Sequence, residues 1–214
     1  MESKGLRRRH DHSGEQALPS TPKTEAIMET AEVDRKLHEL NFYIQRNVRY
    51  NLRRAAFFQR WSRFTAFVGV FLGSASAVTF ISTLPTYVSV ACGMTVAFFS
   101  ALELIVGTGQ RFALHCDLRK RYLELDERLQ SESRPSEKVI RETWSAIRRI
   151  EADEPPHMDA LELMVRNDVL SSIYDQEDLV DHYIPLPWWV RATAQWINWD
   201  TSQAAPIKAQ TATA

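Results

Sequence analysis

Two apolar segments dominate the pattern of hydrophobic and polar positions along the chain. Residues 64–84 contain no charged residue in 21 positions, and residues 87–106 contain a single acid, Glu103, in 20 positions. At about 1.5 Å of rise per residue, each segment is long enough to cross a hydrocarbon core of about 30 Å as a helix. Only two residues separate the segments. The pattern therefore predicts a transmembrane helical hairpin over residues 64–106.

A helical stripe precedes the first apolar segment. From Ala31 onward, apolar residues recur at intervals of three or four, and neither Pro nor Gly interrupts residues 24–68. This period is that of one face of an α-helix, so the sequence predicts an amphipathic helix over residues 29–63 that leads directly into the membrane. The apolar positions of the stripe are Val33, Leu37, Leu40, Ile44, Val48 and Leu52.

Three more helices are predicted after the second apolar segment. The first ends before Pro135, the second begins with Ser136 as its N-cap, and the third covers residues 158–174. Helices that leave a hairpin on the same face pack antiparallel, so we expect the first of these to bury its stripe against residues 29–63. No alternating strand pattern occurs. The predicted fold class is all-α, a two-helix transmembrane hairpin with a cytosolic helical bundle.

These elements divide the chain into six parts. Both ends of the chain lack an apolar period and are rich in small and polar residues, which is typical of disorder. The predicted parts are a disordered N-terminal tail (1–28), a cytosolic amphipathic helix (29–63), the transmembrane hairpin (64–84 and 87–106), cytosolic helices (107–181), a Trp-rich amphipathic segment (182–200) and a disordered tail (201–214).

Charge placement gives the hairpin an orientation. The formal net charge is -1, but no acid lies between Leu40 and Leu102, and basic residues flank both apolar segments. The positive-inside rule therefore places both termini in the cytoplasm. A near-neutral chain has no field that favours nucleic acid, so no specific nucleic acid binding is expected. The flanking basic residues are Arg46, Arg49, Arg53, Arg54, Arg60 and Arg63 before the hairpin, and Arg111, Arg119, Lys120 and Arg121 after it.

Small residues repeat every four positions in both apolar segments. Such faces let helix backbones approach closely in lipid, where van der Waals contact and hydrogen bonds drive association. They join either the two halves of one hairpin, which is the favoured use, or several hairpins. The positions are Gly69, Gly73 and Ala77 in the first segment, and Gly93, Ala97 and Ala101 in the second.

Glu103 is the one acid within the predicted hairpin. A charged side chain costs about 2.5 to 3.5 kcal/mol at the centre of a membrane helix and less near its ends. Because Glu103 lies close to the end of the second segment, it either reaches cytosolic water or pairs with Arg111, or it joins other copies around a water-filled opening that favours cations. Both interpretations stay open, and Glu103 is the candidate pore or gate residue.

Aromatic residues mark the predicted membrane boundaries. Trp61 precedes the first span, Tyr87 lies at the outer turn, and four tryptophans follow Pro185-Leu186-Pro187. On a helix these four would share one face, suited either to the headgroup layer or to packing against protein. The C-terminal positions are Trp188, Trp189, Trp196 and Trp199.

Motifs for catalysis or cofactor binding are not found in the sequence. It contains no phosphate-binding Gly-rich loop, nucleophile elbow or HExxH motif, and its two cysteines, Cys92 and Cys116, lack the spacing of metal ligands or a disulfide framework. In the string His115-Cys116-Asp117, successive side chains of a helix point in different directions and cannot chelate one ion. No enzyme activity, cofactor or metal is expected.

The order of these parts resembles that of the SLATT superfamily, bacterial two-span proteins that accompany nucleotide-signalling and other phage-defence or conflict systems. The resemblance covers about residues 35–180. It implies an effector that oligomerises in the bacterial inner (cytoplasmic) membrane and, when a partner protein or a nucleotide signal triggers it, forms a pore or perturbs the membrane. The residues that carry it are Asn47, Tyr50, Arg53 and Arg54 before the first span, and Arg119, Lys120 and Tyr122 after the second.

Two other functions remain open from the sequence. One is a membrane-anchored scaffold that conducts nothing and recruits partners through its cytosolic helices. The other is a phage membrane protein of the holin kind. A conducting hairpin needs several copies, because two helices cannot enclose a channel, so the pore interpretation also predicts a homo-oligomer.

Overall fold

The computed structural model describes residues 22–74, 81–83 and 85–207, and all regular structure within them is helical. The all-α prediction is therefore confirmed. The helices are α1 (Pro22–Gly73), α3 (Thr86–Val106), α4 (Thr108–Gln130), α5 (Glu137–Glu151), α6 (Asp159–Ile173), α7 (Gln176–Leu179) and α8 (Trp188–Thr193).

The longest element is α1, a single helix of 52 residues. It begins at Pro22, where a missing N–H costs nothing in the first turn, and therefore starts inside the segment predicted to be a disordered tail. It continues past Phe64 without a break to Gly73. Residues 75–80 and 84 of the predicted first span, including Ala77, lie outside the described residues.

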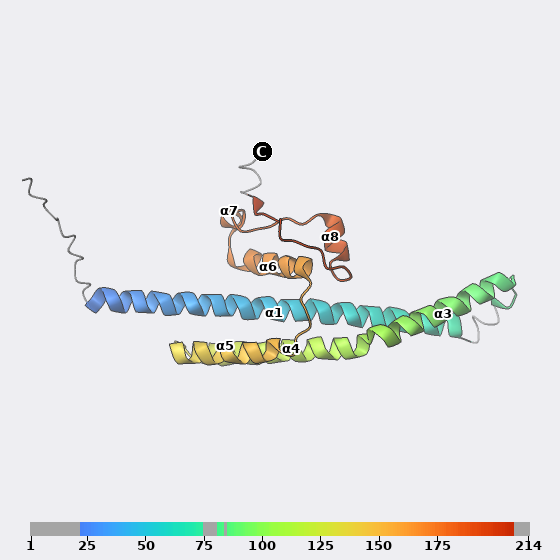
Figure 1. Cartoon of the computed structure of the whole chain (residues 1–214), viewed down its shortest axis with the longest axis horizontal. Coiled ribbons are helices and arrows are strands. Elements are labelled where there is room, and N and C mark those ends of the chain that lie inside the picture. Colours follow the sequence, from blue (N-terminus) through green and yellow to red (C-terminus); the bar gives the residue numbers. More distant parts are fainter. Residues whose placement is uncertain (1–21, 75–80, 84, 208–214) are drawn as a thin grey trace, which may run out of the picture.

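The stripes of α1 and α4 bury each other, as the sequence predicted. The two helices run side by side in opposite directions, and α5 packs along them (Figure 1). Ser136 caps α5 through its side chain, which accepts a hydrogen bond from the Val139 N–H at 3.4 Å. The shared core consists of Leu40, Ile44, Val48, Leu118, Tyr122, Leu129, Ile140, Ile147 and Ile150.

A second hydrophobic core forms on the side of α1 opposite to the first core. Pro155-Pro156 ends the helical run after α5, and the chain then crosses α1, so that α6 and α8 lie on the opposite side from α4 and α5 (Figure 1). This core consists of Tyr50, Ala160, Leu161, Val165, Val190 and Ala194.

The apolar helix α3 projects beyond both cores (Figure 1). None of its 21 residues is buried. Among the described residues, the continuous helical stretch Thr86–Gln130 is the one long and apolar enough to cross a membrane. The predicted hairpin required two such helices. The structure describes the second in full and only part of the first.

Gly107 divides α3 from α4. Its φ of 62° and ψ of 48° lie in the left-handed region, and its N–H donates to the Glu103 carbonyl at 2.9 Å, which closes α3. Only glycine adopts this conformation without a steric cost from Cβ. The direction that α3 takes away from α4 therefore depends on this residue.

Replacing Gly107 by alanine is expected to lower the free energy of unfolding by about 1 kcal/mol. The cost comes from the left-handed backbone, worth roughly 1 to 2 kcal/mol for a residue with Cβ, because no atom lies closer than 3.5 Å to the added carbon. Gly109→Ala is the matched control, since a Cβ there meets nothing within 4 Å and the helix favours alanine. Urea unfolding in mild detergent measures both, and equal losses would contradict the prediction.

Candidate functional site

Glu103 lies near the end of α3 and is held by two threonines. Thr108 of α4 donates its hydroxyl to Oε1, and the Thr65 hydroxyl of α1 lies 3.3 Å from Oε2 and 3.0 Å from the Ser62 carbonyl, two acceptors that share its one proton. Both threonines are buried. Arg111, the cation expected to pair with Glu103, instead donates Nε to the Val106 carbonyl at 2.9 Å. The carboxylate thus links three helices through hydroxyl groups that the sequence interpretation missed.

A cavity of about 350 Å³ opens beside Glu103, between α1 and α3. Hydroxyl groups line one part of it and apolar atoms the rest, so it is polar enough to hold several waters. A carboxylate and hydroxyl groups share this cavity. Water is therefore expected beside Glu103, near the end of the otherwise apolar α3. The lining residues are Ser62, Thr65, Ala66, Gly69, Phe99, Ser100 and Glu103.

The glycines of the predicted packing faces are uncovered within the described residues. A Cβ built at Gly69, Gly73 or Gly93 would meet nothing within 4 Å. Ala97 and Ala101 of α3 are also exposed. At these positions α1 and α3 make no close backbone approach, so the small-residue surface is open to lipid or to another chain.

Aromatic rings gather where α1 and α3 meet the C-terminal segment. The Trp196 ring packs edge to face on Trp61 and Phe57, with centroids 4.7 and 4.6 Å apart, and Trp61 lies 6.1 Å from Phe99 of α3. Phe64 lies 5.5 Å from Phe99 and completes the group. Trp196 therefore contacts α1 just before the predicted first span.

The four C-terminal tryptophans do not lie on one helix, and the predicted common face is wrong. α8 ends at Thr193, where the Trp199 indole Nε1 donates to the threonine hydroxyl at 2.8 Å and its ring packs on Trp189 at 5.0 Å. Trp188 remains 79% exposed. Tyr87 is likewise exposed, in the first turn of α3.

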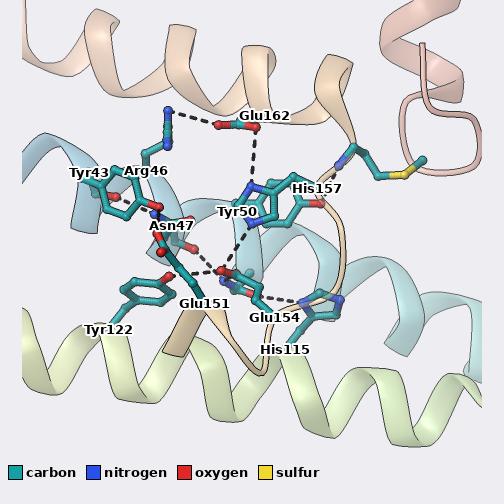
Figure 2. Close-up of polar contacts among 12 residues, drawn as sticks. Tyr43, Arg46, Asn47, Tyr50, His115, Tyr122, Glu151, Glu154, His157 and Glu162 are labelled. Carbon is teal, nitrogen blue, oxygen red and sulfur yellow. Dashed lines mark hydrogen bonds and ion pairs between the residues drawn. The ribbon is translucent and has the colours of Figure 1, made fainter. Parts of the chain in front are cut away.

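A buried polar cluster joins α1, α4 and the connection between α5 and α6 (Figure 2). Glu154 lies at its centre, with 4% of the side chain exposed. Oε1 accepts a hydrogen bond from Asn51 Nδ2 at 2.9 Å, and Oε2 accepts one from the Tyr122 hydroxyl at 3.1 Å. We call it the Glu154 cluster; its members are Arg46, Asn51, His115, Tyr122, Glu154, His157 and Glu162.

His157 bridges two carboxylates in this cluster. Its Nε2 lies 3.4 Å from Glu154 Oε2 and its Nδ1 lies 3.5 Å from Glu162 Oε2, while Glu162 Oε1 pairs with Arg46 at 3.1 Å. Hydrogen bonds to the two carboxylates raise the pKa of His157 to about 9. Burial alone would raise the pKa of Glu154, but hydrogen bonds from His157 and Asn51 hold it below its usual value. Positive and negative groups therefore alternate along this part of the cluster, in the order Arg46, Glu162, His157 and Glu154.

His115 sits at the other end of the cluster and stays neutral. Its Nδ1 lies 2.7 Å from the Asn51 Oδ1, an acceptor, so Nδ1 carries the proton. The ring stacks on Phe58 with centroids 5.7 Å apart. Burial and the nearby Arg54 charge lower the pKa of His115 to about 4. Its neighbour Cys116 is exposed, so the two side chains face different environments.

Several residues that carry the family resemblance make contacts between α1, α4, α6 and the connection that precedes α6. The Tyr50 hydroxyl accepts a hydrogen bond from the Met158 N–H at 3.0 Å, Arg53 pairs with Asp168 of α6, and Tyr122 contacts Glu154. These contacts tie the two cores across α1. No motif or apolar period marks Glu154, His157 or Glu162 in the sequence, although Pro155-Pro156 within an acidic run indicates that the chain turns there.

Glu154, His157, Glu162 and Arg46 pair with one another in turn, so the arrangement acts as an ionic clasp between helices, although Arg46 Nε is buried without a partner. Within the part of the chain that the structure describes, no group of three His, Cys, Asp or Glu side chains is placed to hold a metal ion. Comparisons with family models, curated proteins and solved structures found no match. The resemblance to the SLATT superfamily therefore remains a prediction.

Proposed function

We propose that this chain is an oligomeric effector of the bacterial inner membrane that, when triggered in defence or conflict, forms a pore or otherwise perturbs the bilayer. One observation carries the proposal: α3 presents 21 mostly apolar residues, none of them buried by the rest of the chain. Leaving so much apolar surface in water is unfavourable, and a hydrocarbon layer removes the cost.

In this proposal α3 and the end of α1 lie in the membrane as a two-helix hairpin, with the two helical cores and both termini in the cytoplasm. The exposed apolar surface of α3 supports this placement. The basic flanks favour this orientation, because Arg60 and Arg63 before the first span are exposed and no acid lies near them in the sequence.

Pore formation requires several copies. The uncovered glycines at 69, 73 and 93 supply surfaces on which neighbouring hairpins can pack closely. In a ring of such hairpins, the cavity beside Glu103 would place one carboxylate per copy around the cytoplasmic mouth. A rigid helical collar above the membrane would receive the trigger from a defence or nucleotide-signalling partner, as the family resemblance implies.

Ion flux through liposomes that contain the purified full chain tests this function. Glu103→Gln is expected to lower the preference for cations over anions by up to about thirtyfold, because a unit charge near 4 Å from an ion contributes about 1 kcal/mol even in water, with opposite sign for a cation and an anion. Glu132→Gln, an exposed acid beyond the end of α4, is the matched control and should leave selectivity unchanged.

Other outcomes identify the alternatives. A chain that inserts but passes no ions under any condition is a membrane-anchored scaffold. A chain that is strictly monomeric in mild detergent cannot enclose a pore. A chain that stays in the supernatant after ultracentrifugation of a detergent-free lysate contradicts the membrane placement itself.

A further inference from the structure

The C-terminal tryptophan segment, residues 188–199, leaves large apolar side chains in the open. Trp188 is 79% exposed, Trp196 55% and Ile197 46%. Exposed apolar patches that contain several indole rings usually mark a site of contact with protein or membrane. The question is which contact suits this position in the fold.

The segment is held to the rest of the chain by buried side chains and hydrogen bonds. Its exposed tryptophan side chains therefore lie on an ordered backbone. Val190 and Ala194 are buried in the second core. Arg54 Nη1 donates to the Gln195 carbonyl at 2.8 Å, and Asn198 Oδ1 accepts from the Asp159 N–H at 2.8 Å. The exposed indoles are therefore held in place by other residues of the same segment.

The segment also lies at the level where the membrane begins. Trp196 packs on Trp61, which contacts Phe64 at the start of the first span and Phe99 of α3. Of the helices α5 to α8, α8 lies nearest the end from which α3 projects (Figure 1). An apolar surface continuous with a membrane helix meets the headgroup layer first.

Exposed arginines lie on and beside the segment. Residues 182–199 contain no acid, although the exposed Asp200 follows directly, and Arg191 within α8 is exposed. Arg60 and Arg63, on either side of Trp61 in the sequence, are exposed as well. Indoles favour the headgroup boundary, where the ring is apolar and the N–H stays hydrated, and arginines there attract anionic lipids.

We infer that residues 188–199 form an interfacial foot that rests in the anionic headgroup layer and inserts Trp188 and Trp196 at the acyl boundary. The foot fixes the height and tilt of the cytosolic cores above the bilayer, because it is bonded to α1 through Arg54 and to α6 through Asn198. The inference deepens the proposed function and rests on its membrane placement.

Tryptophan quenching by brominated lipid tests the foot. The full chain is reconstituted in nanodiscs of phosphatidylglycerol and phosphatidylethanolamine, with and without lipids brominated high on the acyl chain. The emission lost in Trp188→Phe should be strongly quenched by bromine. Trp144→Phe is the matched control: Trp144 packs against the first core, 5.2 Å from Tyr43, and the emission lost with it should be insensitive to bromine.

The outcomes separate this inference from the function on which it rests. A chain that enters nanodiscs while the Trp188 emission responds to aqueous iodide and not to bromine overturns the foot alone. A chain that fails to enter nanodiscs overturns the membrane placement and the foot together. Circular dichroism of Trp188→Phe confirms folding, which is expected because the side chain is exposed.

Discussion

Replacing Glu154 by alanine is expected to lower the free energy of unfolding of the bundle formed by α1, α4, α5 and α6 by about 3 to 5 kcal/mol. The substitution leaves His157 charged beside one carboxylate in place of two, and it removes the acceptor of Asn51 and Tyr122. Removing one partner of a buried ion pair costs this much. Here the cost arises because His157 keeps only the Glu162 carboxylate, while Asn51 and Tyr122 lose a buried acceptor. Urea titration followed by circular dichroism, in mild detergent, measures the loss.

Matched variants show whether the loss comes from the buried network. Glu142→Ala removes an exposed pair, with Arg128 at 3.1 Å, and should cost no more than about 1 kcal/mol. Glu154→Gln keeps the shape and part of the hydrogen bonding but removes the charge, and it should fall between the two. A Glu154→Ala variant as stable as Glu142→Ala would show that the cluster contributes little.

The helices and their buried faces were predictable because they follow from periodicity. Leu40 and Ile44 are fully buried, as their place in the stripe of α1 predicted, and Ser136 caps α5 as its position before an apolar period predicted. These features need only local sequence. An N-cap and an apolar period act on the same helix that contains them.

The Glu154 cluster was not predictable in this way, because it depends on contacts between distant parts of the chain. Glu151, Asp153 and Glu154 look like a solvated acidic end of a helix. The turn at Pro155-Pro156 brings Glu154 against Asn51 and Tyr122, 103 and 32 residues away. Periodicity carries no information on such pairs. A run of acidic residues is usually exposed to water, so the burial of Glu154 could not be predicted from it.

The tryptophan segment shows the opposite failure, in which a regular pattern was extended too far. Spacing alone placed Trp188, Trp196 and Trp199 on one helical face. In the structure the Gln195 carbonyl is bonded to Arg54, and Trp199 folds back onto Thr193, so the chain turns after α8. Tertiary contacts override helical spacing over so short a segment. The foot consequently consists of α8 and the turn that follows it.

The stability of the folded chain is expected to be highest near pH 6.5 and to fall on both sides, because the pKa values of His157 and His115 are shifted in opposite directions. The pKa of His157 is raised from 6.5 to about 9 by Glu154 and Glu162. Its contribution is therefore fully present below pH 6.5 and is lost as the pH rises through about 9. The loss amounts to about 3 kcal/mol, since one pKa unit corresponds to about 1.4 kcal/mol.

On the acid side the sign reverses. The pKa of His115 is lowered to about 4, so between pH 6.5 and 4 the unfolded chain binds a proton that the folded chain does not, and stability falls by about 3 kcal/mol. The lowered pKa values of Glu154 and Glu162 extend this decline below pH 4.5. Urea midpoints measured between pH 4 and 9.5 should trace this curve. His157→Gln should abolish the alkaline decline and keep the acid one, whereas His115→Gln should keep the alkaline decline; an unchanged alkaline decline in His157→Gln would show that another group causes it.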